Sequence, residues 1–316
     1  MKIVFIPFFI AVGLLLPLGI KDPYILHILI AIYIWSVLSL GIRLILLGGP
    51  LNLAQASFMG MGAYTSGLLA LRFGWSFWLC MPAAGAVAAL LALVIGYPTL
   101  RIKGAYFVMV TFGITEVFRH IWMMWDSLFG GPQGLLGIPR PDPIHIAGWT
   151  IAFTSKVPFY YLALLLLLMA VFVMYRLDLS RMGLTLSAIR QTDLLAECVG
   201  VNIMAYKVGA FVISSFFAGI VGSFWAHYFT YCSPDDFTFL ASFQMLVYAV
   251  MGGMGSALGP VLGCIVMLGL DEILRPFQQY MPIILGGILI LFLLYLPGGF
   301  VSIMARIRAL SRRRSD

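Results

Sequence analysis

Long runs of apolar residues recur along the 316-residue chain, separated by short polar or glycine-rich segments. A bilayer core about 30 Å thick needs roughly 20 apolar residues per helix, and most runs have this length. The first run lacks a small-residue cleavage site and is followed at once by a second run, which disfavours a signal peptide. The pattern predicts membrane-spanning helices near residues 3–19, 24–47, 52–72, 75–96, 104–125, 158–176, 207–229 and 279–296.

Residues 240–270 form a further apolar stretch without any charge, which Gly-Gly-Met-Gly-Ser at 252–256 divides. One helix here gives nine crossings, whereas two short crossing segments give ten and place both termini on one side. Ten crossings with a cytoplasmic N-terminus leave thirteen of the 19 Lys and Arg residues inside and five outside, with Arg119 within a helix. Cytoplasmic loops are enriched in basic residues, so charge favours ten crossings with cytoplasmic N- and C-termini over nine. A full crossing and a re-entrant path stay alternatives for residues 240–270.

Composition excludes a soluble enzyme, because 62% of the residues are hydrophobic, 10% are charged and mean hydropathy is +1.04. Soluble domains carry about 25% charged residues. The chain has no phosphate-binding loop, no metalloprotease or nucleophile-elbow motif and no paired cysteines. The net charge of +7 follows from topology and a basic tail at 305–316 that meets lipid headgroups, so nucleic-acid binding is not indicated.

Two segments are expected outside the bilayer. An outer loop at about 126–157 is rich in proline and glycine, and a cytoplasmic segment at 177–206 carries charges of both signs. Thr192 and Asp193 are suited to cap a short helix with Gly200 after its end, and Asn202 to cap the next helix. Apolar Ile189, Leu194 and Leu195 suit docking in a groove of a partner. A solvated connection without contacts is the competing interpretation.

Glycine and small-residue patterns fall into two kinds. Ladders such as Ser214–Ala218–Gly222 and Gly255–Gly259–Gly263 predict close helix packing. Gly-Gly pairs at 48–49 and 252–253 each precede a short helix, and such paired interruptions mark either a substrate path or simple helix breaks. The candidate path-lining residues are polar groups within spans: Asn52, Gln55, Tyr64, Tyr106, Thr111 and Gln244.

Ionisable groups within the predicted spans are concentrated at Glu116, Arg119 and His120, which share one helix face. Their spacing favours a Glu116–Arg119 pair. An intramembrane charge suggests function, but a structural pair near the interface is an equal alternative. The chain shows no unpaired carboxylate near the middle of a span, which disfavours a proton symporter.

Five ordered segments resemble a known family. These are "LNLAQASFMGMGAYTSGLL" (51–69), "TLRIKGAYFVMVTFGITEVFR" (99–119), "FGGPQGLLGIP" (129–139), "SAIRQTDLLAECVGVNIMAYK" (187–207) and "HYFTYCSPDDFTFLASFQMLVYAVMGGMGSALGPVLG" (227–263). They resemble the LivM-type permease subunits of branched-chain amino acid ABC importers, and the resemblance covers about residues 35–300. It implies an all-α, polytopic transmembrane bundle that forms a single permease domain over residues 1–316, in the inner membrane of a bacterium.

The resemblance also implies partners. They are a homologous LivH-like permease subunit, two cytoplasmic ABC ATPase subunits (LivG/LivF-like) and a periplasmic substrate-binding protein. ATP then binds to the ATPase subunits, and this chain has no cofactor, metal or catalytic residue of its own. The segment at 187–207 becomes the expected ATPase-coupling site, with Ile189, Arg190, Asp193, Leu194, Glu197 and Gly200 as its candidate residues.

One departure concerns cargo. The family commonly has Ser-Leu-Gly-His where this chain has Asn52-Leu53-Ala54-Gln55. Leucine, isoleucine and valine are the cargo that the resemblance implies, and related amino acids, urea or short amides are the alternatives. An autonomous secondary transporter or channel for small polar solutes is the rival function, and it would need no partner chains.

Overall fold

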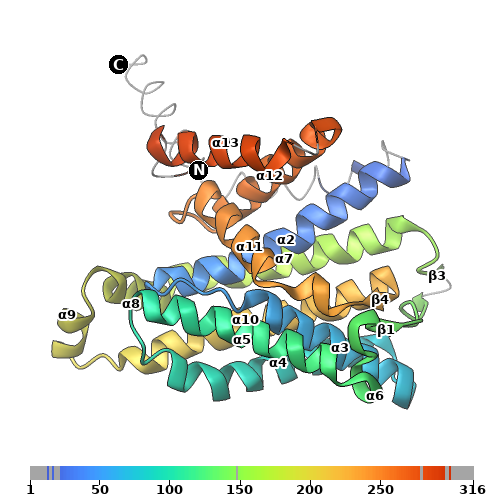
Figure 1. Cartoon of the computed structure of the whole chain (residues 1–316), viewed down its shortest axis with the longest axis horizontal. Coiled ribbons are helices and arrows are strands. Elements are labelled where there is room, and N and C mark those ends of the chain that lie inside the picture. The colour runs from blue at the N-terminus through green and yellow to red at the C-terminus, as the bar shows by residue number, and fades with distance from the viewer. Residues whose placement is uncertain are drawn as a thin grey trace.

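The computed structural model describes residues 22–146, 149–277 and 280–295, together with Gly13, residues 16–17 and Gly299. The basic tail at 305–316 and nearly all of the predicted span 3–19 lie outside the described residues. The described chain is a bundle of helices with four very short strands (Figure 1).

The predicted spans correspond to helices in every case that the described residues cover. By length and apolar composition, α2 (Pro23–Leu47), α4 (Phe77–Thr99), α5 (Ala105–Met124), α7 (Lys156–Leu179) and α10 (Ile203–Phe229) qualify as membrane spans. The more polar α3 (Gln55–Phe73) and the shorter α13 (Met281–Tyr295) also lie where helices were predicted.

The uncharged stretch at 240–270 is two helices, as the division at 252–256 predicted. They are α11 (Phe239–Gly252) and α12 (Gly259–Leu274). Gly253 has a φ of +100°, which glycine adopts without strain. A Cβ atom on Gly252 would overlap the carbonyl of Gly259, and one on Gly263 would overlap that of Tyr248. Small residues therefore let α11 and α12 approach backbone to backbone.

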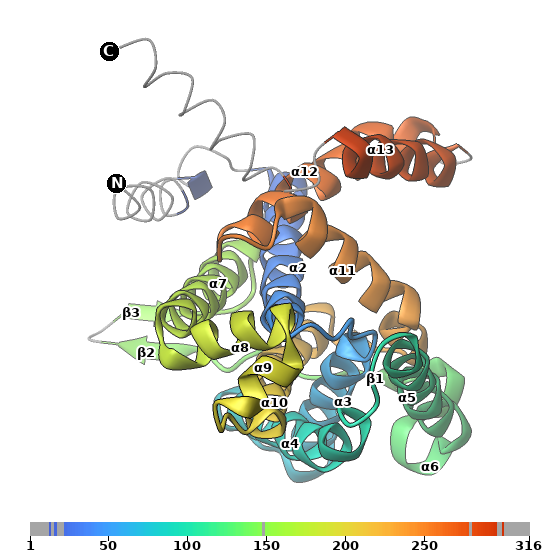
Figure 2. The same ribbon diagram turned by 90° about the vertical axis from the view of Figure 1, so that its left-hand side faces the viewer.

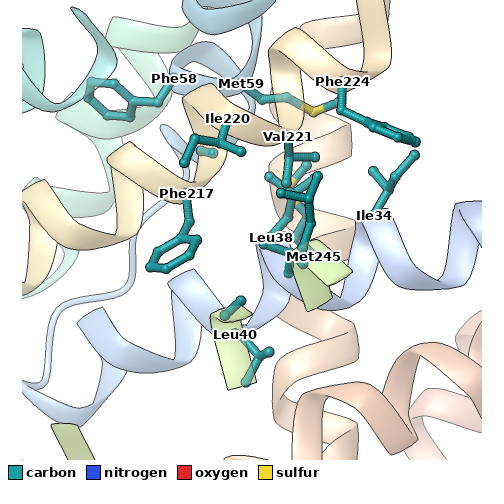
Figure 3. Close-up of a cluster of buried hydrophobic side chains, with 14 of the residues drawn as sticks. Ile34, Leu38, Leu40, Phe58, Met59, Phe217, Ile220, Val221, Phe224 and Met245 are labelled. Atoms are coloured by element: carbon teal, nitrogen blue, oxygen red, sulfur yellow. The ribbon is translucent and has the colours of Figure 1, made fainter. Parts of the chain in front are cut away.

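Helix α10 lies at the centre of the bundle, between α2, α3 and α4 (Figure 2). Its small residues allow close contact, since a Cβ atom on Gly222 would overlap the backbone of Met59 and Ala63 in α3. Apolar side chains of α2, α3, α10 and α11 fill the space between these helices (Figure 3): Ile34, Leu38, Leu40, Phe58, Met59, Phe217, Ile220, Val221, Phe224 and Met245.

The predicted outer loop has more structure than turns. It contains α6 (Asp126–Phe129), η1 (Gly131–Gln133), β1 (Leu135–Leu136), β2 (Ile144–Ile146) and β3 (Trp149–Ile151). Strand β2 pairs with β3, and β1 pairs antiparallel with β4 (Tyr231–Cys232), which follows α10 and precedes η2 (Pro234–Phe237). A last short turn, η3 (Arg275–Phe277), follows α12.

A buried histidine anchors this outer loop to the bundle. The Nδ1 atom of His227 lies 2.6 Å from the carbonyl oxygen of Pro139, so Nδ1 carries the proton, because a carbonyl only accepts. Nε2 then accepts from the Ser66 hydroxyl at 2.8 Å, and Ser66 in turn lies 2.7 Å from the Ser223 hydroxyl. The imidazole of His227 thereby joins α3, α10 and the predicted outer loop.

The segment at 177–206 forms two short helices, α8 (Arg181–Gln191) and α9 (Asp193–Cys198). They lie at the end of the bundle opposite to β1, β3, β4 and α6 (Figure 1). The two non-membrane segments predicted from sequence thus occupy opposite ends of the molecule.

Candidate functional site

The connection between α2 and α3 is unwound over residues 48–54. Gly49, with a φ of +100°, turns the chain. Unwound backbone within a bundle must find hydrogen-bond partners in neighbouring protein. Helix α5 supplies two: the amide of Leu53 donates to the hydroxyl of Thr111 (3.2 Å), and the hydroxyl of Thr115 donates to the carbonyl of Leu53 (2.9 Å).

Helices α10 and α11 hold the start of α3 in the same way. The amide of Ala56 donates to the Ser242 hydroxyl of α11 at 2.8 Å. The Ser214 hydroxyl of α10 donates to Oε1 of Gln55 at 3.0 Å, and Nε2 of Gln55 donates to the Ser214 carbonyl at 3.3 Å. The unwound segment between α2 and α3 is therefore a junction, held in place by three further helices, α5, α10 and α11.

Sequence reasoning named Thr111 and Gln55, but it did not single out Thr115 or Ser242, and it noted Ser214 only as part of a packing ladder. The threonines at 111 and 115 are one helical turn apart in α5, just before its charged residues Glu116 and Arg119. This i, i+4 polar pair was the available signal, because it predicts one polar stripe on α5. Nothing in the sequence pairs Ser214 or Ser242 with α3.

Of the six candidate path residues, the structure buries four within the bundle. Oδ1 of Asn52 accepts a hydrogen bond from the amide of Ala54 at 2.9 Å, and Nδ2 of Asn52 has no hydrogen-bond partner among the described residues. Tyr64 stacks on Trp122 with ring centroids 4.8 Å apart, so it joins α3 to α5. Tyr106 and Gln244 lie instead on exposed faces of α5 and α11, where Tyr106 is 72% exposed.

A cleft of about 940 Å³ lies beside this junction. One wall is the turn at 48–51 with Leu53, and a second is the α4–α5 connection with the first two turns of α5. The cleft is also lined by Phe239 of α11 and by the predicted coupling segment at about 177–206, called the coupling segment below. The cleft brings three of the candidate coupling residues next to the unwound segment: Ile189, Arg190 and Asp193.

The charged group on α5 pairs as predicted. Nη1 of Arg119 lies 3.0 Å from Oε2 of Glu116, and Nη2 lies 3.3 Å from Oδ1 of Asp235 in η2. His120 is exposed on the same helix. The arginine therefore links α5 to the outer segment after β4, as a structural pair near a helix end does.

Helix α9 ends in the manner that the sequence predicts. Gly200 has a φ of +81°, its amide donates to the carbonyl of Glu197 (2.9 Å), and the amide of Val201 donates to that of Ala196 (3.1 Å). These two bonds make a Schellman motif. Asn202 accepts the amide of Ala205 at 3.1 Å, so its predicted role as the cap of α10 is confirmed.

The predicted side-chain cap at the start of α9 is wrong. Thr192 holds the capping position without a side-chain hydrogen bond. The carboxylate of Asp193 instead binds Lys207 of α10 and Lys103 of the α4–α5 connection, each at 3.2 Å. Partial burial by itself raises the pKa of Asp193, but hydrogen bonds from the two ammonium groups outweigh it and lower the pKa below its ordinary value.

The two faces of the coupling segment differ. Gly183, Leu186 and Ile189 face inward, and Ile189 is 1% exposed, so it anchors α8 instead of projecting from it. The opposite side is open and carries large apolar side chains: Leu184, Leu194, Leu195 and Val199. Arg190, Glu197 and Gly200 are exposed as well. We call Leu194 and Leu195, together with Val199 directly after the helix, the apolar face of α9. Sequence reasoning missed Val199.

Within residues 22–146, 149–277 and 280–295, no three His, Cys, Asp or Glu side chains lie close enough together to hold a metal ion. The polar groups at the junction hold backbone and form no nucleophile–base arrangement. A bundle of apolar helices is the architecture of a multi-pass membrane protein, and an unwound, internally bonded segment beside a cleft is typical of transport proteins.

Comparison with known proteins agrees with this class. The family model "Branched-chain amino acid transport system / permease component" matches residues 24–296. The chain belongs to this family of permease components, which confirms the resemblance seen in its sequence. It is 33% identical over 287 residues to the high-affinity branched-chain amino acid transport system permease protein LivM of Escherichia coli and of Salmonella typhimurium, covering 85% of this chain and 68% of each relative.

Two more distant relatives broaden the picture. The chain is 26% identical over 191 residues to the permease protein LivH of the same E. coli transport system, covering 60% of this chain and 58% of LivH. It is 28% identical over 181 residues to a putative glucose ABC transporter permease protein of Haloferax volcanii, covering 55% of this chain and 54% of that protein. No solved structure is significantly similar to the chain.

Proposed function

We propose that this chain is one of two homologous permease subunits of an ATP-binding-cassette importer in a bacterial inner membrane. Its cargo is a branched-chain amino acid, with related small amino acids or amides as alternatives. A LivH-like permease subunit, two cytoplasmic ATPase subunits and a periplasmic binding protein complete the complex. ATP is bound by the ATPase subunits, and the present chain supplies half of the path.

The observation that carries the proposal is the apolar face of α9. Leu195 of α9 is 65% exposed, and Val199, which directly follows α9, is 83% exposed. Both lie outside the predicted spans, where lipid does not cover them. Exposed apolar groups that gather on one short helix mark a protein interface. Similarity to both LivM and LivH supports a partner that is itself a homologous permease, and similarity to LivM supports the cargo.

We further propose ten crossings with both termini in the cytoplasm, on the same side as α8 and α9. The positive-inside rule supports this orientation, and the native cysteines make it testable. Cys198 at the end of α9 is exposed, whereas Cys80, Cys232 and Cys264 are buried. A membrane-impermeant maleimide should label Cys198 in inside-out vesicles and leave it unlabelled in intact spheroplasts.

A matched control reverses the expected pattern. Ser155 precedes α7 at the end of the outer loop, is exposed, and makes no capping hydrogen bond. Ser155→Cys in a Cys198→Ser background should react in spheroplasts alone. Labelling of both positions from the same side would contradict the proposed orientation.

For transport we propose that the path runs along the exposed side of α5 and α11 and passes the cleft at 48–53. Polar groups in a membrane span seldom face lipid, which supports Tyr106 and Gln244 as groups that face the path. Asn52, Gln55, Tyr64 and Thr111 then hold the path wall in shape. Nucleotide binding moves the ATPase subunits, α8 and α9 follow, and the helices switch between two arrangements.

Transport by purified components tests the function. The complete complex should accumulate labelled leucine, isoleucine or valine in liposomes, while the chain alone should carry none. Uptake by the chain alone would favour the autonomous transporter. Gln244→Leu in the complete complex should lower uptake by about tenfold, an effect of the size typical for one lost polar contact to charged cargo.

A further inference from the structure

A buried arginine connects three elements at the α8 end of the bundle. Arg43 of α2 is 3% exposed. Its Nη1 and Nη2 atoms donate to Oδ1 and Oδ2 of Asp178 in α7 at 3.1 and 2.9 Å. Its Nε donates to the carbonyl oxygen of Met254 at 3.0 Å. Since the guanidinium is planar and rigid, these three bonds fix the relative positions of their partners.

The Asp178 side of this connection leads to the coupling segment. Asp178 is the penultimate residue of α7, and α8 begins three residues later. The corner is tight: the Ser180 hydroxyl donates to the Leu177 carbonyl at 2.7 Å, and a Cβ atom on Gly183 would overlap that same carbonyl. Because no slack separates α7 from α8, a displacement of α8 displaces Asp178.

The Met254 side leads to the break between α11 and α12. Residues 253–258 are non-helical, while the two helices on either side touch through glycine backbones. The coupling segment reaches this break a second time, since Nη1 of Arg190 at the end of α8 lies 3.6 Å from the sulfur of Met254. Two routes therefore join α8 to one loop, and Arg43 carries the buried one.

We propose that Arg43 is a positioning residue that transmits movement of the coupling segment to the break at 253–258, so that α11 and α12 reorient when the ATPase subunits close. The inference rests on the proposed function. The bond from Nε of Arg43 to the Met254 carbonyl places the guanidinium directly between the end of α7 and the interrupted helix pair. Arg43 is thus placed to convert nucleotide binding into rearrangement of the path.

The test compares ATP hydrolysis with uptake in the complete complex reconstituted in liposomes. Removing one member of a buried ion pair leaves an uncompensated charge, so the key variant is the double replacement Arg43→Gln and Asp178→Asn, which removes both charges. Uptake per ATP hydrolysed should fall about tenfold, within the usual range of coupling free energies, while hydrolysis stimulated by the binding protein persists. Arg43→Lys keeps the charge but loses the paired hydrogen bonds of the guanidinium to Asp178. Its uptake per ATP hydrolysed should lie between those of the wild type and the double variant.

Arg176→Gln is the matched control, because Arg176 is exposed on the same turn of α7 and lies over the Phe172 ring. It should leave the uptake-to-hydrolysis ratio unchanged. A wild-type ratio in the double variant would overturn the proposal. So would a parallel loss of uptake and hydrolysis or a failure to assemble, since either result marks a structural role. Failure of the proposed function is separate, because the unmutated complex would then show no ATP-driven uptake.

A distance measurement gives a readout that a structural role would not affect. Spin labels at Arg181→Cys on α8 and Gly255→Cys in the break, in a Cys198→Ser background, report on both ends of the connection. A Cβ atom at 255 would meet no atom within 4 Å. ATP should change the distance distribution between the labels in the otherwise unmodified complex. Addition of the double replacement should alter that ATP-dependent change, and an identical response would contradict the proposal.

Discussion

A chain in which Leu195 and Val199 are both replaced by aspartate is expected to lose ATP-driven uptake by about 100-fold or more while still inserting and folding. Both side chains are exposed on α9, so the isolated chain loses no core contact. In the proposed complex they enter a groove of an ATPase subunit. Central apolar contacts typically contribute about 2 kcal/mol or more each, and each 1.4 kcal/mol corresponds to about tenfold in affinity.

The control adds the same charge without removing apolar surface. Gln191 and Thr192 are exposed in the same segment, and the Thr192 side chain makes no capping hydrogen bond. Gln191→Asp with Thr192→Asp should retain most of the uptake. The ATPase subunits should fail to co-purify with the variant at Leu195 and Val199 and should co-purify with the variant at Gln191 and Thr192. Normal co-purification and uptake with Leu195 and Val199 replaced would remove the main support for docking at α9.

Gly222→Val is expected to destabilise the chain itself by about 3 kcal/mol or more, at the upper end of what overpacking costs. A Cβ atom at 222 would overlap the Met59 carbonyl and approach the Ala63 amide nitrogen closely. Backbone atoms cannot turn aside as a flexible side chain does, so α10 must move away from α3. Thermal unfolding in detergent should show a midpoint lowered by about 5 °C or more.

Gly113→Val provides the comparison within the same fold. Gly113 is also a helical glycine, in α5, but a Cβ atom there meets no atom within 4 Å. Its unfolding midpoint should stay within about 2 °C of the wild type, since substitutions that disturb no packing have small effects. Equal destabilisation by both variants would mean that α3 and α10 do not depend on close backbone contact.

The helices and their close contacts followed from sequence because their causes are local. Apolar length located the described spans, and the ladder at Ser214, Ala218 and Gly222 predicted that its helix packs closely against a neighbour, without specifying α3 as that neighbour. The glycine pairs at 48–49 and 252–253 marked two real interruptions. Strands β1 and β4 could not be foreseen, because each has only two residues and they pair residues that are almost a hundred positions apart.

The candidate site was predictable in outline but not in its contacts. Apolar residues of the coupling segment were recognised, yet only the packing of α8 decides that Ile189 points inward while Val199 points outward. Asp193 was expected to cap a helix. Its lysine partners come from α10 and from the α4–α5 connection, and no local pattern specifies them. For the same reason the arginine at 43 had no visible partner in the sequence.

The most direct measurement is labelled amino acid uptake into liposomes that hold this chain, its homologous permease partner, the ATPase subunits and the binding protein. Accumulation is expected with ATP on the side that α8 and α9 face, and not with ADP or with the ATPase subunits omitted. Accumulation that is independent of ATP and of the ATPase subunits would contradict the account.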